Sequence, residues 1–71
     1  MKTDFVINAD WTGGGGWRRA TVKINTKNAA EAYNEYYGTE RRVNDTFIIE
    51  NDSYNEFDMM VKSYNLSLTF K

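Results

Sequence analysis

The stretch of this chain best suited to binding is Trp11–Trp17, in which four consecutive glycines lie between two tryptophans. Backbone amides of glycine-rich loops hold phosphate groups in many nucleotide-binding proteins. Here no lysine followed by serine or threonine comes after the glycines, and the G-x-G-x-x-G spacing is absent. A strand rather than a helix is also predicted next. The spacing therefore excludes both common phosphate-binding loops.

The two tryptophans leave two interpretations of this loop open. In the first, Trp11 and Trp17 pack together across two strand ends, below a mobile glycine tip. In the second, the loop orders on a partner and one or both tryptophans act as anchors, because tryptophan is enriched among residues that dominate binding energies. The predicted partner-binding residues are Trp11, Gly13, Gly14, Gly15, Gly16, Trp17, Arg18, Arg19 and Lys23.

A basic stripe follows the loop. Residues that share one face of an extended segment here are Trp17, Arg19, Thr21 and Lys23, with Arg18 adjacent and Arg41–Arg42 as an extension. An aromatic ring beside cations can stack a base and hold phosphates. However, nine basic and ten acidic residues give a net charge of -1, which argues against binding dominated by phosphate contacts. Pairing of Lys23 with Asp4 and of Arg19 with Asp10, across a hairpin, is the simpler interpretation.

Catalytic chemistry has few residues to use. The chain has neither histidine nor cysteine, so the commonest general base, the commonest metal ligand and all disulfides are missing. The acidic residues near the predicted second helix are Glu50, Asp52, Glu56 and Asp58. They lack EF-hand spacing, and the dipole of a helix already favours acids at its N-terminus. We therefore expect no catalytic residues, no metal, no cofactor and no enzymatic activity.

The elements that position these residues follow from hydrophobic periodicity. Alternation predicts strands over Thr3–Asp10 and Trp17–Asn25, which form an antiparallel hairpin with Trp11–Trp17 as its tip. Arg41–Glu50 is extended again. The turn residues Asn44–Asp45 leave the segment 41–43 as either a short extra strand or an approach loop.

Two helices are predicted. The first begins at the N-cap Asn28 and ends at Gly38 in the left-handed conformation. The second begins at Ser53, in an S-x-x-E capping box, and ends at Asn65. The apolar stripes are Ala29, Ala32, Tyr33 and Tyr36 in the first helix, and Tyr54, Phe57, Met60, Val61 and Tyr64 in the second. Met59 lies off its stripe and is predicted to be exposed.

A last strand is predicted over Leu66–Phe70. The order is then β-β-α-β-α-β, and two amphipathic helices require one apolar sheet face to cover. We therefore expect a single α+β domain over residues 1–71, a small two-layer α/β sandwich with both helices on one sheet face. If the last strand is outermost, its free edge offers a route to a homodimer.

The absence of a leader and of an apolar run near ~18 residues predicts a soluble cytoplasmic protein without membrane contact. The features together favour a non-enzymatic protein that binds a larger protein. The Asn-, Tyr-, Ile- and Lys-rich composition is typical of AT-rich coding sequences, as in low-GC bacteria and their phages. In that setting we expect a small inhibitor of a bacterial host or defence enzyme, in the manner of anti-CRISPR proteins, which acts by occlusion or by blocking a conformational change. A nucleic-acid-binding module on the open sheet face and a self-associating structural subunit are the alternatives.

Overall fold

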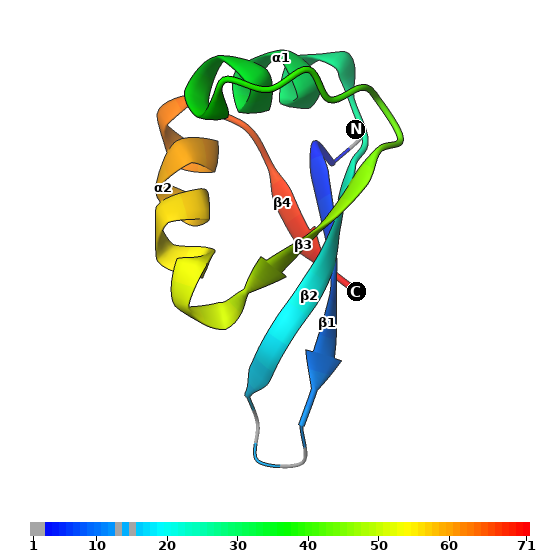
Figure 1. Ribbon diagram of the computed structural model, residues 1–71, viewed down its shortest axis with the longest axis vertical. Coiled ribbons are helices and arrows are strands. Elements are labelled where there is room, and N and C mark those ends of the chain that lie inside the picture. Colours follow the sequence, from blue (N-terminus) through cyan, green and yellow to red (C-terminus); the bar gives the residue numbers. More distant parts are fainter. Residues whose placement is uncertain (1–2, 13, 15) are drawn as a thin grey trace.

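The computed structural model describes residues 3–12, 14 and 16–71. Its elements in chain order are β1 (Phe5–Trp11), β2 (Trp17–Ile24), α1 (Lys27–Tyr37), β3 (Thr46–Glu50), a 3-10 turn (Asn51–Ser53), α2 (Tyr54–Ser63) and β4 (Leu68–Phe70). The predicted β-β-α-β-α-β order is confirmed, and the fold is a small α+β arrangement of a four-stranded sheet with two helices (Figure 1). Within these residues, neither helix has the length and apolar character that crossing a membrane requires.

The sheet has the strand order β3-β2-β1-β4. β1 is antiparallel to β2 and parallel to β4, and β2 is antiparallel to β3. The C-terminal strand is thus at an edge, but it covers only Leu68–Phe70 instead of Leu66–Phe70. It starts late because the backbone N–H of Leu66 donates to the carbonyl of Val61 and completes the end of α2. β3 forms the opposite edge.

Both helices contribute to one hydrophobic core on one face of the sheet. The buried residues of this core are Phe5, Ile7 and Ala9 of β1, Ala20, Val22 and Ile24 of β2, Ala29, Ala30 and Tyr33 of α1, Ile49 of β3, and Phe57, Met60 and Val61 of α2. At its centre the rings of Phe5 and Phe57 meet edge to face, with centroids 5.0 Å apart. The alternation predicted for β1 and β2 is confirmed by this pattern. Tyr36, which the sequence places in the apolar stripe of α1, is exposed instead.

The start of α1 differs from the prediction. Thr26 is the N-cap instead of Asn28, and its Oγ1 accepts a hydrogen bond from the backbone N–H of Ala29 at 3.1 Å. The Thr26 hydroxyl in turn donates to the carboxylate of Asp4. The chain that enters β1 therefore fixes where the helix begins. At the other end Gly38 has a φ of 68°, which confirms the predicted left-handed cap.

α2 begins directly after Ser53, as predicted, but the predicted capping box at Ser53 does not form. Ser53 has a helical backbone and makes no capping hydrogen bond, because the 3-10 turn before it runs directly into α2. Asn65 has a φ of 58°, as expected for a helix end of this kind.

The segment from residue 41 to 43 is an approach loop, not a strand. The side chain of Asn34 holds it in place. The Asn34 amide donates to the carbonyl of Arg41 at 2.8 Å, and its Oδ1 accepts from the N–H of Arg41 at 2.7 Å. Asn44 then turns the chain into β3 with a φ of 76°.

Asp4 does not pair with Lys23 as the hairpin alternation predicts. One carboxylate oxygen of Asp4 accepts hydrogen bonds from the N–H and the hydroxyl of Ser67, at 2.9 and 3.2 Å. Lys23 lies across from Val6 in the ladder. Asp4 therefore links β1 to the approach of β4 and, through Thr26, to the start of α1.

Candidate functional site

The end of the β1–β2 hairpin is closed by Thr12. Its N–H donates to the carbonyl of Gly16 at 2.8 Å, and its hydroxyl donates to the same oxygen at 3.1 Å. Gly14 and Gly16 are exposed, and a Cβ placed on either would meet no atom within 4 Å. The predicted binding residues Gly13 and Gly15 lie outside the described residues.

A β-bulge lies one step below this tip. Ala9 pairs with Ala20 and Trp11 pairs with Trp17, so one residue of β1 faces two residues of β2. The extra residue shifts the alternation of β2 by one position. The prediction that Trp17 shares a face with Arg19 and Lys23 is therefore wrong, since the bulge moves Trp17 to the face that packs on the helices.

An aromatic cluster results at this end of the helix-covered face. The Trp17 ring meets Tyr54 of α2 edge to face at 5.8 Å and lies 6.3 Å from Phe70 of β4. Trp11 lies 6.2 Å from the same Phe70 ring. The tryptophans thus each pack on Phe70. Trp17 is half-buried and structural, whereas Trp11 and Phe70 stay 55% and 38% exposed.

The bulge also gathers charged side chains. Arg18 and Arg19 line one hollow together with Asp10 and Glu50. Arg19 is also the ladder partner of Glu50. The two arginines at this end of the sheet therefore lie close to two acidic residues.

Lys23 and Arg41 complete the account of the predicted basic stripe. Lys23 is exposed on the open sheet face, with Thr46 as its neighbour in β3. Arg41 is not an extension of the stripe. Its guanidinium carbon lies 4.8 Å from the ring centroid of Phe47 and 5.5 Å from that of Tyr33. The stripe has thus lost Trp17 and Arg41.

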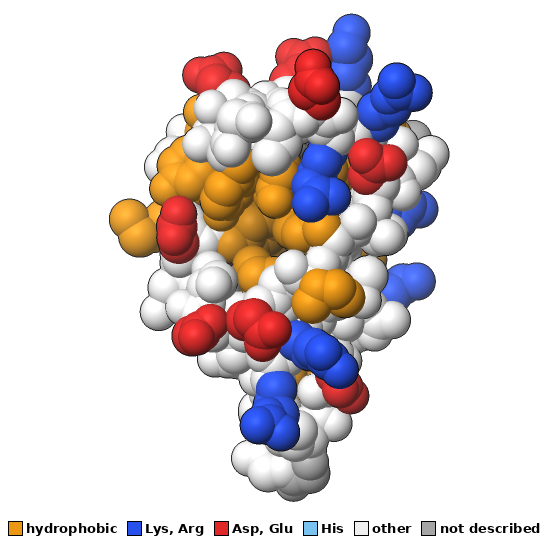
Figure 2. All heavy atoms as spheres, viewed as in Figure 1, with side chains coloured by type: hydrophobic (Ala, Val, Ile, Leu, Met, Phe, Trp, Pro, Cys, Tyr) orange, Lys and Arg blue, Asp and Glu red, His pale blue; other side chains and the backbone are white. Residues whose placement is uncertain are grey.

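A second surface, which the sequence did not reveal, lies at the free edge of β3. It is a hollow of about 250 Å³ lined by Tyr33, Tyr37, Phe47, Ile48, Ile49, Glu50, Ser53, Glu56 and Phe57. We call it the β3 groove. Figure 2 shows hydrophobic side chains gathered in a hollow between the two helices and β3, with both acidic and basic side chains around it.

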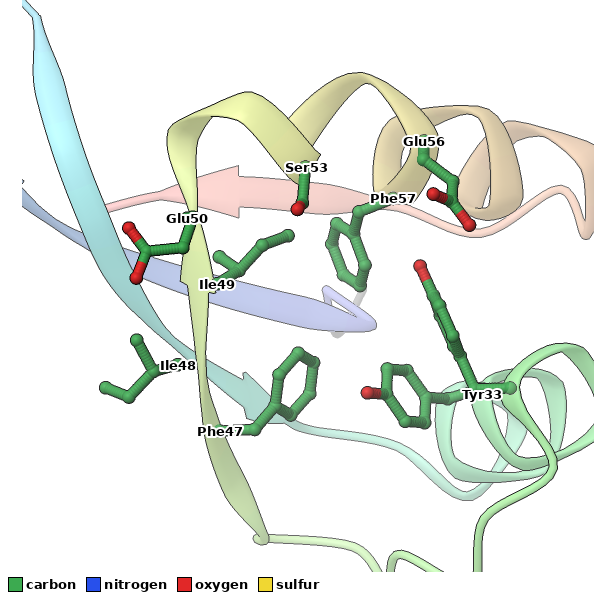
Figure 3. Close-up of a pocket in the computed structure, with 9 residues that line it drawn as sticks. Tyr33, Phe47, Ile48, Ile49, Glu50, Ser53, Glu56 and Phe57 are labelled. Carbon is green, nitrogen blue, oxygen red and sulfur yellow. The ribbon is translucent and has the colours of Figure 1, made fainter.

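The groove follows the edge of β3. Consecutive strand residues point to opposite faces, yet four consecutive residues of β3 line this one hollow. Figure 3 shows Phe47 and Ile49 directed toward the helices, whereas Ile48 and Glu50 point to the other side of the strand. The hollow therefore opens onto the backbone of β3.

The chemistry of the groove is aromatic and acidic. Rings of Tyr33, Phe47 and Phe57 form its walls, and Glu50 and Glu56 are among its lining residues, with the Glu50 side chain directed to the other side of β3. Burial, and then the nearby carboxylate of Glu56, raise the pKa of Tyr37 to about 12. Its phenol is therefore neutral at physiological pH. Such walls attract cations, as the stacking of Arg41 on two of the rings illustrates.

The acidic residues around the start of α2 include one member of an ion pair. Asp58 pairs with Lys62 one turn later, at 2.9 Å. Across the part of the chain that the structure describes, no three acidic side chains come together as a possible metal site. Met59 is exposed, as predicted.

In comparisons with known proteins, no protein-family model matches this chain, and no curated protein or solved structure matches it significantly. A functional inference therefore rests on the geometry of the two surfaces, the end of the hairpin and the β3 groove.

Proposed function

We propose that this protein is a non-enzymatic binding protein that contacts a larger protein through the end of its β1–β2 hairpin. The observation that supports this most is the pair of exposed aromatic rings of Trp11 and Phe70, 6.2 Å apart. Exposed aromatic side chains gain the most from burial in an interface. Trp17 and Tyr54 pack against Phe70 from within the fold, so this surface needs little reordering to bind.

The surroundings of the aromatic pair suit an interface rim. Arg18 and Arg19 project near the same end of the hairpin, among the carboxylates of Asp10 and Glu50. An apolar centre with a polar, charged border is the usual composition of a protein–protein contact. Arginine is also enriched in such contacts.

The cellular location and the target of this protein are inferred from its amino-acid composition alone. We propose a bacterial cytoplasm, with a host or defence enzyme as the target. A small phage-type inhibitor of the anti-CRISPR kind would act there by occluding a channel or by blocking a conformational change.

The two alternative functions receive no specific support from the geometry. The open sheet face lacks Trp17, and Arg19 sits opposite Glu50, so stacking and phosphate contacts are both weakened. Self-association through β4 would use an edge strand of three residues. Salt titration with DNA and RNA tests the first alternative, and light scattering over a range of protein concentrations tests the second.

The central experiment is affinity capture from bacterial lysate with the wild type and Trp11→Ala. We expect Trp11→Ala to lose a specific partner while it keeps the wild-type circular dichroism spectrum. Met59→Ala is the matched control, because Met59 is an exposed apolar side chain on α2. An unchanged set of captured proteins for Trp11→Ala would contradict the proposal.

A further inference from the structure

We propose that the β3 groove receives an extended segment of a partner protein, which adds a strand to the edge of β3 and directs a lysine or arginine on its helix side toward Glu56. This contact goes beyond the hairpin contact proposed above and does not depend on it. Three observations support it: the unpaired backbone, the shape of the hollow, and its charge.

The first observation is the free edge of β3. This strand pairs with β2 on one side and is the last strand of the sheet on the other. Among the described residues, the hydrogen bonds made outside helices and strands include none from the backbone of Phe47, Ile48 or Ile49. Neither proline nor lysine, the usual guards of an edge, occurs in β3. Its outer amides and carbonyls can therefore pair with an added extended chain.

The second observation is the hollow beside this edge. Side chains of an added strand alternate between the two sheet faces. Those on the helix side would enter the space of about 250 Å³ walled by Tyr33 and Phe57. Those on the open side would lie against Ile48, which is 61% exposed. The groove thus offers an apolar contact to each set of side chains.

The third observation is charge complementarity. Glu56 brings a carboxylate to the helix side of a hollow with aromatic walls, and both features attract a cation. Arg41 stacks on Phe47, near the first residues of β3, whereas Glu56 lies in the first turn of α2, after the last residue of the strand. The cation of the partner therefore belongs beside Glu56. An acidic side chain in that place would be repelled.

The charge also separates a foreign segment from a second copy of this chain. A symmetric dimer through this edge would place β3 against β3. The sequence of β3, Thr-Phe-Ile-Ile-Glu, supplies no basic residue to Glu56. A segment with a lysine or arginine supplies one, so we assign the groove to that partner.

The test uses blocked hexapeptides of alternating threonine and valine, with arginine placed at each position in turn. A matched set carries glutamate at the same positions. Amide chemical shifts of the ¹⁵N-labelled protein report the site and the affinity. We expect the best arginine peptide to shift the amides of Thr46–Glu50 in a saturable manner. The corresponding glutamate peptide should bind at least about tenfold more weakly, because its carboxylate and that of Glu56 repel each other.

Two variants locate the charge effect. Glu56→Gln should weaken the arginine peptide about threefold, as expected for one solvent-exposed ion pair. Glu35→Gln removes the same charge from an exposed position of α1 that does not line the groove. This control should bind as the wild type does.

Three results would overturn the proposal: no shift of the β3 amides by any arginine peptide, equal binding of the arginine and glutamate peptides, or β3 shifts that follow protein concentration without peptide. The last result would assign the edge to a second copy. Trp11→Ala should bind the peptides normally, so failure of the groove and failure of the hairpin contact are read from different variants.

Discussion

Replacing Gly14 or Gly16 by alanine is expected to stabilise the isolated protein. Neither glycine has a φ in the left-handed region, and an added Cβ would meet no atom within 4 Å. Alanine therefore fits the native backbone, while it reduces the conformational freedom of the unfolded chain. Each change should raise the free energy of unfolding by about 0.4–1 kcal/mol. In a chain of this length, 1 kcal/mol corresponds to a rise in melting temperature of about 4–8 °C.

Gly38 provides the matched comparison. An added Cβ there would also meet open space, but its φ is 68°. Alanine is strained in this left-handed region, so Gly38→Ala should lower the free energy of unfolding by about 1–2 kcal/mol. The three variants thus differ in the backbone angle and not in steric room. Urea denaturation followed by circular dichroism measures all three. A loss of stability in Gly14→Ala or Gly16→Ala, or a gain in Gly38→Ala, would refute the reasoning.

The same variants connect stability to binding. If the freedom of the tip is used when a partner is contacted, Gly14→Ala and Gly16→Ala will bind more weakly in the capture experiment although they are more stable. Opposite signs for the two measurements would show that these glycines serve binding. Equal or stronger capture would show that alanine serves the contact as well.

Trp17→Ala should lower the free energy of unfolding by about 2–3 kcal/mol, less than for a fully buried tryptophan, and Trp11→Ala by about 1 kcal/mol or less; equal losses in chemical denaturation would contradict the packing described for the two rings. Asp4→Ala should lower the free energy of unfolding by about 1–3 kcal/mol, because the donors of Thr26 and Ser67 lose their acceptor. Asp10→Ala should change the free energy of unfolding by no more than about 0.5 kcal/mol. The pKa of Tyr37 is raised from 10.0 to about 12 by folding. Its neutral phenol therefore contributes stability that is fully present below pH 10.0 and is lost as the pH rises toward 12. Tyr37→Phe should flatten the alkaline loss of stability in that window, and tyrosinate absorbance of the wild type should keep rising at higher pH than that of Tyr37→Phe.

Much of the fold could be predicted because patterns of neighbouring residues indicate most of its strands and helices. Alternation identifies β1 and β2, helical spacing identifies the buried face of α2, and Gly38 marks the end of α1. These signals depend on residues close together in the sequence. The start of α1 could not be placed in this way. Thr26 and Asn28 are both good N-caps, and the choice between them depends on the distant Asp4.

The candidate site was only partly predictable for the same reason. The sheet face predicted for Trp17 was wrong, because the spacing of apolar residues does not reveal the bulge at Arg18–Arg19. Phe70 reaches the hairpin only because β4 lies beside β1, and one sequence does not give the strand order. The β3 groove depends on that order as well. Its lining combines α1, β3 and α2, whose residues look individually like ordinary core or surface.

The parallel pairing of β1 with β4 sets the order in which the fold can be completed during synthesis. β1 emerges before β4 and pairs with β2 early, but its second edge stays open until β4 has been synthesised. Until then Asp4 lacks Ser67, and the rings of Trp11 and Trp17 lack Phe70. A nascent chain that has not reached β4 therefore exposes an open strand edge and unpacked tryptophans. Native stability and the finished hairpin surface then appear in the same late step.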